Sequence, residues 1–211
     1  MATWRLLQLA DSAFPTGGFA HSAGLEAAAQ AGEVPDLAAF TRGALWQAGF
    51  GSLPLLQDAW EDPEALARLD ARADVFLANH VANRASRTQG GAFASTCARV
   101  FPGEAPPLPD GLCMHLAPLW GAVFRALGME LEDARALFLW STARGVLSAG
   151  VRLGLAGTYE AQRTLAGLAP ALDTVAARCA ALGADDLAQP APLLDLLHGT
   201  HDRLHSRLFQ S

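Results

Sequence analysis

Three histidines stand close together in the last part of the 211-residue chain, at His198, His201 and His205. Residues spaced at i, i+3 and i+7 share one face of an α-helix, and Asp202 lies beside them. Because imidazole binds nickel as well as zinc, this face is a candidate site for a transition-metal ion. An ordinary polar face near a chain end is the alternative, and the spacing leaves both interpretations open.

A second group of reactive side chains comprises Asp11, Ser12, His21 and Ser22. They supply a nucleophile and a base, so a small helical hydrolase using His21 and Ser22 is one hypothesis. Serine chemistry also needs a group that orients the histidine and an oxyanion hole, and the spacing indicates neither. A helix stop at Asp11 and Ser12, with a helix cap at Ser22, explains the same residues. Without a phosphate loop, a dinucleotide fingerprint or an HExxH pair, we expect neither catalysis nor a cofactor.

The overall composition restricts the class of protein. The net charge is −6 and the isoelectric point is about 5.4, with no lysine and no dominant basic stripe, so nucleic-acid binding is not expected. Cys97, Cys113 and Cys179 fit neither a disulfide framework nor a zinc spacing, which favours buried thiols in a reducing compartment. The chain shows no long apolar span and no signal-peptide pattern, so we expect a cytoplasmic protein that does not enter a membrane.

Residue types also indicate the fold class. Ala and Leu dominate, isoleucine is absent, and 51% of the residues are hydrophobic. Such a chain has little material for a sheet but enough apolar surface for a sizeable core. We therefore predict an all-α, single-domain bundle of about ten helices over residues 1–211.

Turn and cap signals divide the chain into these helices. The pair Pro35-Asp36 begins one helix, which Gly49 and Gly51 interrupt. The pair Asp62-Pro63 begins another, which runs to about residues 83–87. A surface loop is expected from Pro102 to Gly111. The later helices are expected at Leu112–Leu127, Glu130–Leu153 as the candidate central helix, Thr158–Leu168 and Pro170–Leu182.

Between the first two helices lies an elbow that must position the early polar residues. A short helix ends at Asp11-Ser12, Pro15 fixes its own φ, and the pair Gly17-Gly18 permits positive φ. Ser22, or the neighbouring His21, then caps a helix through Glu26. The aromatic rings at positions 14 and 19 suggest that the elbow is packed against other parts of the protein.

The same stretch resembles the N-terminal signature of the UreF family of urease accessory proteins. The signature has an LLQL-like helix, Asp-Ser, Pro, a glycine pair, Phe and His-Ser-x-Gly-Leu-Glu. The matching residues are Leu6-Leu7-Gln8-Leu9, Asp11-Ser12, Pro15, Gly17-Gly18-Phe19, His21-Ser22 and Gly24-Leu25-Glu26.

The C-terminal segment, residues 193–211, resembles the same family. Its members end in a pattern close to Pro-x-Leu-Asp-Leu, His-Glu and Arg-Leu-Phe-x-Ser. This chain has Pro192-Leu193-Leu194-Asp195-Leu196, His201-Asp202 and Arg207-Leu208-Phe209-Gln210-Ser211, with Asp202 in place of the glutamate. Apolar side chains this near an end usually fray into water. We therefore expect Leu208 and Phe209 either to dock on a partner or to fold back in a way that partner binding completes.

Weaker matches lie between the two ends. Arg152-Leu153, Gly157 and Gln162 keep part of an Arg-Leu-x-Pro-Leu-Gly-Gln pattern, although other positions of it differ. The stretch Arg87-Thr88-Gln89-Gly90 resembles an Arg-x-Gln-Gly motif, and His115 with Gly121 matches a His-x(5)-Gly spacing.

The resemblance implies a non-enzymatic maturation factor with an all-α fold that dimerises. Such a protein bridges UreD (also called UreH) on apo-urease and the GTPase UreG, which carries the nickel that is inserted. It implies partner contacts for His21, Arg152, His201, Asp202, Arg207, Leu208, Phe209 and Ser211. The remaining motif positions are structural: Asp11, Ser12, Pro15, Gly17, Gly18, Ser22, Gly24 and Glu26. An all-α adaptor for another enzyme system is the second hypothesis, and the hydrolase is the third.

Overall fold

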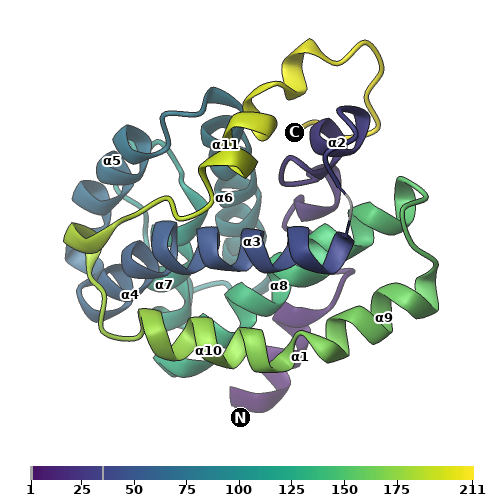
Figure 1. The fold of residues 1–211 in the computed structure, drawn as a ribbon. Helices are drawn as coiled ribbons and strands as arrows, with labels where there is room; N and C mark the ends of the chain where they lie inside the picture. The colour runs from purple at the N-terminus through teal and green to yellow at the C-terminus, as the bar shows by residue number, and fades with distance from the viewer. Residues whose placement is uncertain (1, 35) are drawn as a thin grey trace.

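The computed structural model describes residues 2–34 and 36–211 and contains no strand there, which confirms the all-α prediction. Figure 1 shows a single bundle of α-helices, with long connections from α1 to α2, from α6 to α7 and from α10 to α11. The helices are α1 (Ala2–Ala10), α2 (Leu25–Gln30), α3 (Leu37–Gly51), α4 (Leu53–Glu61), α5 (Leu66–Phe76), α6 (His80–Val100), α7 (Leu116–Ala126), α8 (Leu131–Arg152), α9 (Thr158–Gly167), α10 (Ala169–Cys179) and α11 (Pro192–Gly199). Short 3-10 helices occur at Gly18–Ala20 (η1), Pro63–Ala65 (η2), Ala184–Asp186 (η3) and His201–Arg203 (η4).

The helix α7 packs mainly against α4 and α6. Every residue of α7 from position 117 to 124 is buried, whereas α8 alternates buried and partly exposed positions. The rings of Phe93 and Phe124 flank Trp120 with centroid separations of 4.9 and 5.0 Å, and Phe138 of α8 meets it edge-on. The candidate central helix, α8, packs against α1, α2, α3, α4, α7, α9 and α10, which fits a central position, and α7 is a second helix with a mostly buried surface.

The helix expected from Asp62-Pro63 to residues 83–87 is in fact two helices. After the η2 turn, α5 ends at Phe76 and α6 begins at His80. The Asn79 side chain accepts a 3.0 Å hydrogen bond from the Val81 N–H and so caps a new helix start. Its amide also donates to the Asp195 carbonyl, which ties α11 to this end of α6. The helical periodicity continues across the break, which is why the sequence pattern did not reveal it.

The two glycines expected to interrupt α3 lie inside it, because α3 continues to Gly51. A Cβ on Gly49 would clash with Val175 of α10, so this glycine allows two helices to approach closely. At the other end of α3, Asp36 caps the helix as predicted, with its carboxylate accepting from the Ala38 N–H. Pro35 lies outside the described residues.

The loop predicted from Pro102 to Gly111 is present, but α7 starts at Leu116 rather than Leu112. The backbone N–H groups of residues 113–115 donate to the buried Asp70 carboxylate, which holds this segment in place before the helix begins. Met114 adopts a φ of 72°, which a continuous helix would not contain. The Met114 carbonyl lies against Gly90 of α6, where a Cβ would clash.

The elbow between α1 and α2 contains two left-handed glycines, Gly17 with φ 74° and Gly24 with φ 83°. Gly18 does not have a positive φ, so only one member of the predicted pair needs to be glycine for that reason. Gly24 occupies the N-cap position of α2 and has no side chain to cap it, so the capping hydrogen bond comes from Ser22, two residues earlier. The Ser22 hydroxyl accepts from the Glu26 N–H at 3.3 Å. Phe14 is buried and stacks on Phe101, as expected of a packed elbow.

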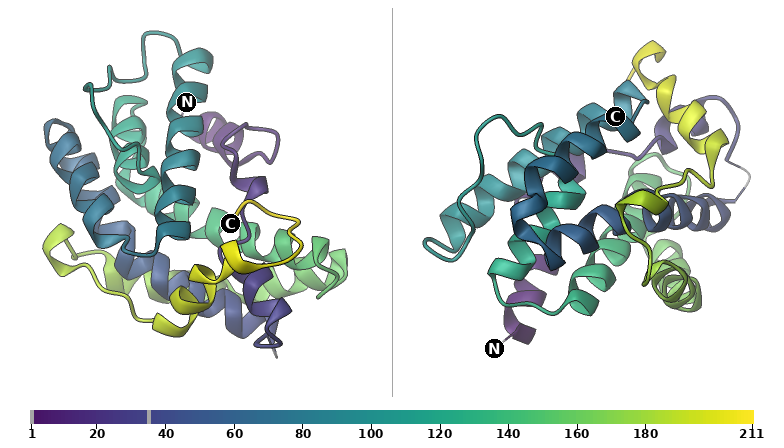
Figure 2. Two further views of the ribbon diagram at one scale, coloured as in Figure 1. Left: turned by 90° about the horizontal axis from the view of Figure 1, so that it is seen from above. Right: turned by 90° about the vertical axis from the view of Figure 1, so that its left-hand side faces the viewer.

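The C-terminal segment returns to the start of the chain. Both views in Figure 2 show it running beside the elbow and α2. Phe209 is 5% exposed and belongs to a small core with Leu25, Phe40 and Val146. None of the helices in the described part of the chain is long and apolar enough to cross a membrane.

Candidate functional site

The three C-terminal histidines do not share a helix face. The helix α11 ends at Gly199, His201 belongs to η4, and His205 is exposed beyond both. His201 is fully buried and His198 is partly buried. The predicted metal-binding face is therefore not formed, because the chain turns between the first and second histidine.

Glu26 is the main contact between the two ends of the chain. Its carboxylate is 2% exposed and accepts the backbone N–H groups of Leu208 and Phe209 at 2.6 and 3.1 Å. It also lies 3.1 Å from the Nε2 atom of His201. One carboxylate therefore receives three hydrogen bonds from the C-terminal segment, which is the way in which a buried acidic group is stabilised.

His21 and Ser22 hold the last residue of the sequence. The backbone N–H and the hydroxyl of Ser22 donate to the Ser211 carbonyl at 2.6 and 2.9 Å. The His21 Nδ1 atom lies 2.6 Å from the Ser211 hydroxyl oxygen. We call the contacts of His21, Ser22 and Glu26 with His201 and residues 208–211 the tail clasp.

Arg152, at the end of α8, lies between two aromatic rings. Its guanidinium carbon is 3.8 Å from the ring centre of Phe19 and 4.2 Å from that of Phe209. The guanidinium also donates to the Phe19 carbonyl. Cation–π contacts of this kind join the elbow, α8 and the C-terminal segment. Phe19 was expected to be packed, but its other face is open and it is 72% exposed.

Asp202 forms an ion network on the outside of the tail clasp. Both of its oxygens accept from the Arg84 guanidinium, at 2.7 and 3.0 Å, and it also pairs with His80 and Arg207. The hydrogen bonds from Arg84 lower the pKa of Asp202 below its ordinary value. Arg84 was not among the predicted site residues, and a lone helical arginine gives no signal in the sequence that would identify it.

Burial makes two of the histidines near the tail clasp hard to protonate. Desolvation, with smaller contributions from His201, His21 and Arg84, lowers the pKa of His198 to about 4. Desolvation followed by the charge of Arg84 also lowers the pKa of His21. Both imidazoles are therefore neutral at pH 7.

Comparison with known proteins shows which family this chain resembles. The family model described as UreF matches residues 32–169 of the chain. A urease accessory protein F of Arabidopsis thaliana is 37% identical over 99% of this chain and 92% of its own length. Proteins named urease accessory protein UreF from Rhizobium leguminosarum bv. viciae and Cereibacter sphaeroides are 34% and 37% identical. Those alignments cover 100% and 98% of this chain, and 96% and 97% of the relatives.

The chain belongs to the UreF family.

The two terminal UreF motifs, which the family model does not reach, converge on the tail clasp. Of the positions expected to contact partners, His21, His201, Phe209 and Ser211 are buried within the chain's own fold. In this conformation they hold the C-terminal segment in place. Leu208 is 52% exposed and Arg207 is exposed, so these two remain on the surface.

The hydrolase hypothesis finds no support in this UreF fold. The Ser22 hydroxyl donates to the Ser211 carbonyl, not to His21, and Ser22 is 1% exposed. A serine nucleophile needs a hydrogen bond to its base and access to a substrate. Ser22 has neither, since the C-terminal segment covers it.

Proposed function

We propose that this chain is a urease accessory protein that acts as a non-enzymatic adaptor. In this proposal it bridges UreD (UreH) on apo-urease and the GTPase UreG, so that nickel carried by UreG enters the urease active site in the cytoplasm. Membership of the UreF family is the observation that carries the proposal. Nickel is the cargo of this process and is not assigned a resident site here.

We assign the UreD contact to the exposed surface around the tail clasp. Phe19, Arg207 and Leu208 are exposed there, while the residues beneath them are buried and hydrogen-bonded. Phenylalanine and arginine are residue types enriched at protein interfaces, and arginine is also enriched at interface hot spots. The tail clasp presents them on a fixed backbone, which limits the conformational entropy that binding has to remove.

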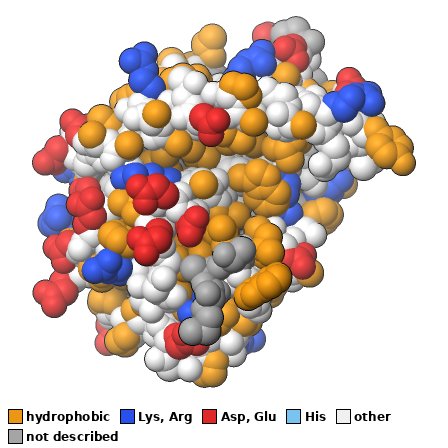
Figure 3. Space-filling view, turned by 90° about the horizontal axis from the view of Figure 1, so that it is seen from below, with side chains coloured by type: hydrophobic (Ala, Val, Ile, Leu, Met, Phe, Trp, Pro, Cys, Tyr) orange, Lys and Arg blue, Asp and Glu red, His pale blue; other side chains and the backbone are white. Residues whose placement is uncertain are grey.

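A homodimer is the proposed assembly of the adaptor. Trp4 and Leu7 of α1 are 77% and 57% exposed. Figure 3 looks at the molecule from the side on which α1 begins and shows hydrophobic side chains gathered across this face. We propose that a second copy of the chain packs against the α1 face, the exposed surface around Trp4 and Leu7.

The test combines partner capture with urease maturation. The double variant Phe19→Ala and Leu208→Ala should lose most UreD co-purification and most urease activation in cells lacking the native gene. Each truncated side chain contributes about 1–2 kcal/mol at a packed interface, so a weakening of at least about thirtyfold is expected. The measured quantities are the UreD recovered with the chain, the urease activity, and the nickel content of urease.

The matched control is Val75→Ala, which removes a side chain that is 82% exposed on α5. It should leave capture and activation unchanged, and both variants should stay folded, the double variant losing only about 1 kcal/mol with the exposed Phe19–Arg152 contact. If neither UreD nor UreG co-purifies with the parent chain, and deletion of the gene leaves urease activity intact, an adaptor role in another system replaces this proposal.

A further inference from the structure

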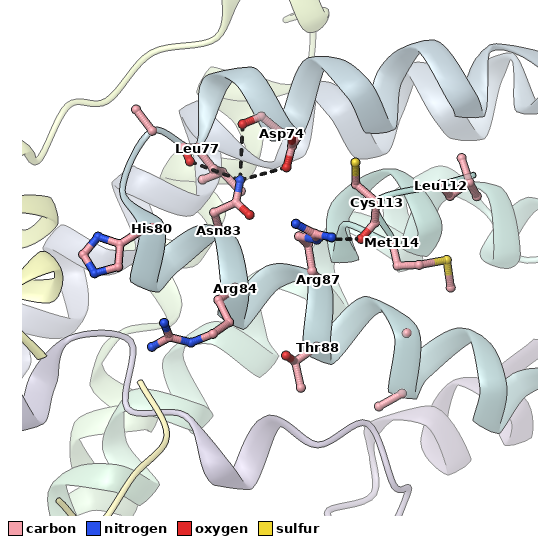
Figure 4. A pocket seen from close by; sticks show the side chains of 13 residues that line it. Asp74, Leu77, His80, Asn83, Arg84, Arg87, Thr88, Leu112, Cys113 and Met114 are labelled. Atoms are coloured by element: carbon pink, nitrogen blue, oxygen red, sulfur yellow. Dashed lines mark hydrogen bonds between the residues drawn. The ribbon is translucent and has the colours of Figure 1, made fainter. Parts of the chain in front are cut away.

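A groove of about 980 Å³ lies where α5 and α6 face the segment that precedes α7, and its lining includes His80 and Arg84, which pair with Asp202. Figure 4 shows Asp74 and Asn83 joined by a hydrogen bond at one end of the groove, with Arg87 and Cys113 beside them. Neither the tail clasp nor the proposed partner surface uses these residues.

Three different metal-ligating side chains meet at this end of the groove. An oxygen of Asp74, the sulfur of Cys113 and a ring nitrogen of His115 all lie within 4.8 Å of one another. The Nε2 atom of His115 is 3.1 Å from Oδ1 of Asp74. In a tetrahedral zinc site, bonds of about 2.0–2.3 Å place ligand atoms about 3–4 Å apart. The histidine and aspartate already have this spacing, and the Cys113 sulfur lies within 4.8 Å of both ligand atoms.

We propose that Asp74, Cys113 and His115 form a binding site for a thiophilic divalent cation of the Zn²⁺ type, with its fourth position open to the groove. One carboxylate, one thiolate and one imidazole are a ligand set that such ions bind in preference to Mg²⁺ or Ca²⁺. The proposal does not depend on the adaptor function.

The surroundings orient each of the three ligands. His115 is fully buried, and its Nδ1 atom lies 3.1 Å from the Ser86 hydroxyl oxygen, which leaves Nε2 directed at Asp74. The Asn83 amide donates to Asp74 at 3.0 Å. The Asp70 carboxylate accepts the backbone N–H groups of Cys113 and His115, and so fixes the backbone positions from which these two side chains extend. Metal-bound histidines and carboxylates are usually held by outer contacts of this kind.

Binding of the ion requires two protons to be accounted for. Without an ion, the short distance from Nε2 to Asp74 places the imidazole proton on Nε2. When an ion binds Nε2, that proton is lost and Nδ1 takes one up, which it donates to the Ser86 oxygen. The Cys113 thiol loses its proton to solvent, so one proton is released overall. Arg87 donates to the Cys113 carbonyl at 3.1 Å. Its positive charge lies beside the two negative charges that the Asp74 carboxylate and the Cys113 thiolate carry in the ion-bound site.

Cys113 is also the cysteine best placed to act as a ligand. Cys97 and Cys179 are fully buried, and burial raises the pKa of both thiols, that of Cys97 to about 12. Cys113 is partly exposed at the groove, which corrects the expectation that all three thiols are buried. A thiolate–metal signal from this protein would therefore report on Cys113.

The test is a titration of the full chain with Co²⁺, followed by displacement with Zn²⁺. Cobalt bound to a thiolate gives a ligand-to-metal charge-transfer absorption, which carboxylate and imidazole sites lack. We expect one Co²⁺ per chain with this absorption, and its loss when one equivalent of Zn²⁺ is added. Cys113→Ser should abolish the absorption, and Asp74→Asn should weaken Co²⁺ binding at least about tenfold.

His205→Ala is the matched control, because it removes an exposed histidine far from the groove in sequence and should leave the titration unchanged. Circular dichroism of each variant checks that it is folded. If Cys113→Ser does not fold, the Co²⁺ affinity of Asp74→Asn tests the proposal instead. Absence of the absorption in the parent chain, or its persistence in folded Cys113→Ser, overturns the proposal. Its loss in His205→Ala would place the ion elsewhere and would also overturn it.

Discussion

At the scale of single residues, Glu26 is the group on which the tail clasp depends most directly. Replacing it with glutamine keeps the shape but puts an amide N–H₂ where an oxygen accepted a backbone N–H from Leu208 or Phe209. Hydrogen bonds to a charged acceptor contribute about 1.5–3 kcal/mol each, so Glu26→Gln should lower the free energy of unfolding by about 2 kcal/mol or more. Urea denaturation measures this. Glu33→Gln, at an exposed acidic residue, is the control, and an equal loss in both variants would contradict the role assigned to Glu26.

His198 gives a prediction about pH. Its pKa is about 4 in the folded chain and about 6.5 when unfolded, so below pH 6.5 the unfolded state binds a proton that the folded state does not. Stability that is fully present above pH 6.5 is therefore lost as the pH falls to about 4, by at most about 1.4 kcal/mol per pH unit for this residue. His21 acts in the same direction. The lowered pKa values of Asp74 and Asp202 affect stability only below about pH 3.8, outside this window.

The variant His198→Gln should flatten the dependence of unfolding free energy on pH between 6.5 and 4. His205→Gln should leave it as steep as in the parent, because that histidine is exposed. The measurement is a series of urea denaturation curves across this pH range. Equal slopes in the parent and in His198→Gln would show that His198 does not titrate in the way its burial implies.

At the scale of the elements, the elbow makes different demands on two of its glycines. Gly24 has φ 83°, and a Cβ there would lie 2.8 Å from Cβ of His198 on α11. Gly18 has no positive φ, and a Cβ there would meet ordinary contacts at 3.6 and 3.7 Å. Gly24→Ala should therefore lower stability by about 1–2 kcal/mol or more, while Gly18→Ala changes it by less than about 0.5 kcal/mol. Thermal melts should separate the two by several degrees.

The C-terminal segment offers a similar pair of adjacent residues. Phe209 is 5% exposed in the core with Leu25, whereas Leu208 is 52% exposed. Phe209→Ala should lower the free energy of unfolding by about 3–5 kcal/mol through the lost burial and the cavity. Leu208→Ala should hardly change it. Denaturant unfolding of both variants checks this, and a small effect of Phe209→Ala would mean that the segment leaves the core in solution.

At the scale of the whole molecule, the α1 face leads to a prediction about assembly. Introducing two carboxylates with Trp4→Glu and Leu7→Glu would bury charge in any contact that this face makes with a second copy. We expect the parent chain to sediment as a dimer and the double variant as a monomer, by analytical ultracentrifugation. Val75→Glu on α5 is the control. A dimer that survives the double variant would place the interface elsewhere.

Local chemistry let the sequence by itself determine the fold class and several helix ends. Helix propensity, which is high in a chain rich in Ala and Leu and without isoleucine, is a property of each residue's own backbone. A cap such as Asp36 likewise bonds to backbone only two residues away. The terminal motifs, which are contiguous stretches, likewise indicated the family. The helices α5 and α6 continue the same spacing of apolar residues, so the sequence pattern did not show that the chain breaks at Asn79 between them.

Only the tertiary structure decided which distant residues meet. Glu26 and His201 are separated by 175 positions, and His115 and Asp74 by 41, so no spacing in the sequence predicts either contact. The three histidines do not share a face because η4 turns the chain toward Glu26, and Phe209 is buried because α2, α3 and α8 leave space for its ring. Such contacts depend on how whole helices pack, and packing sums many weak interactions over surfaces that the order of residues along one segment does not reveal.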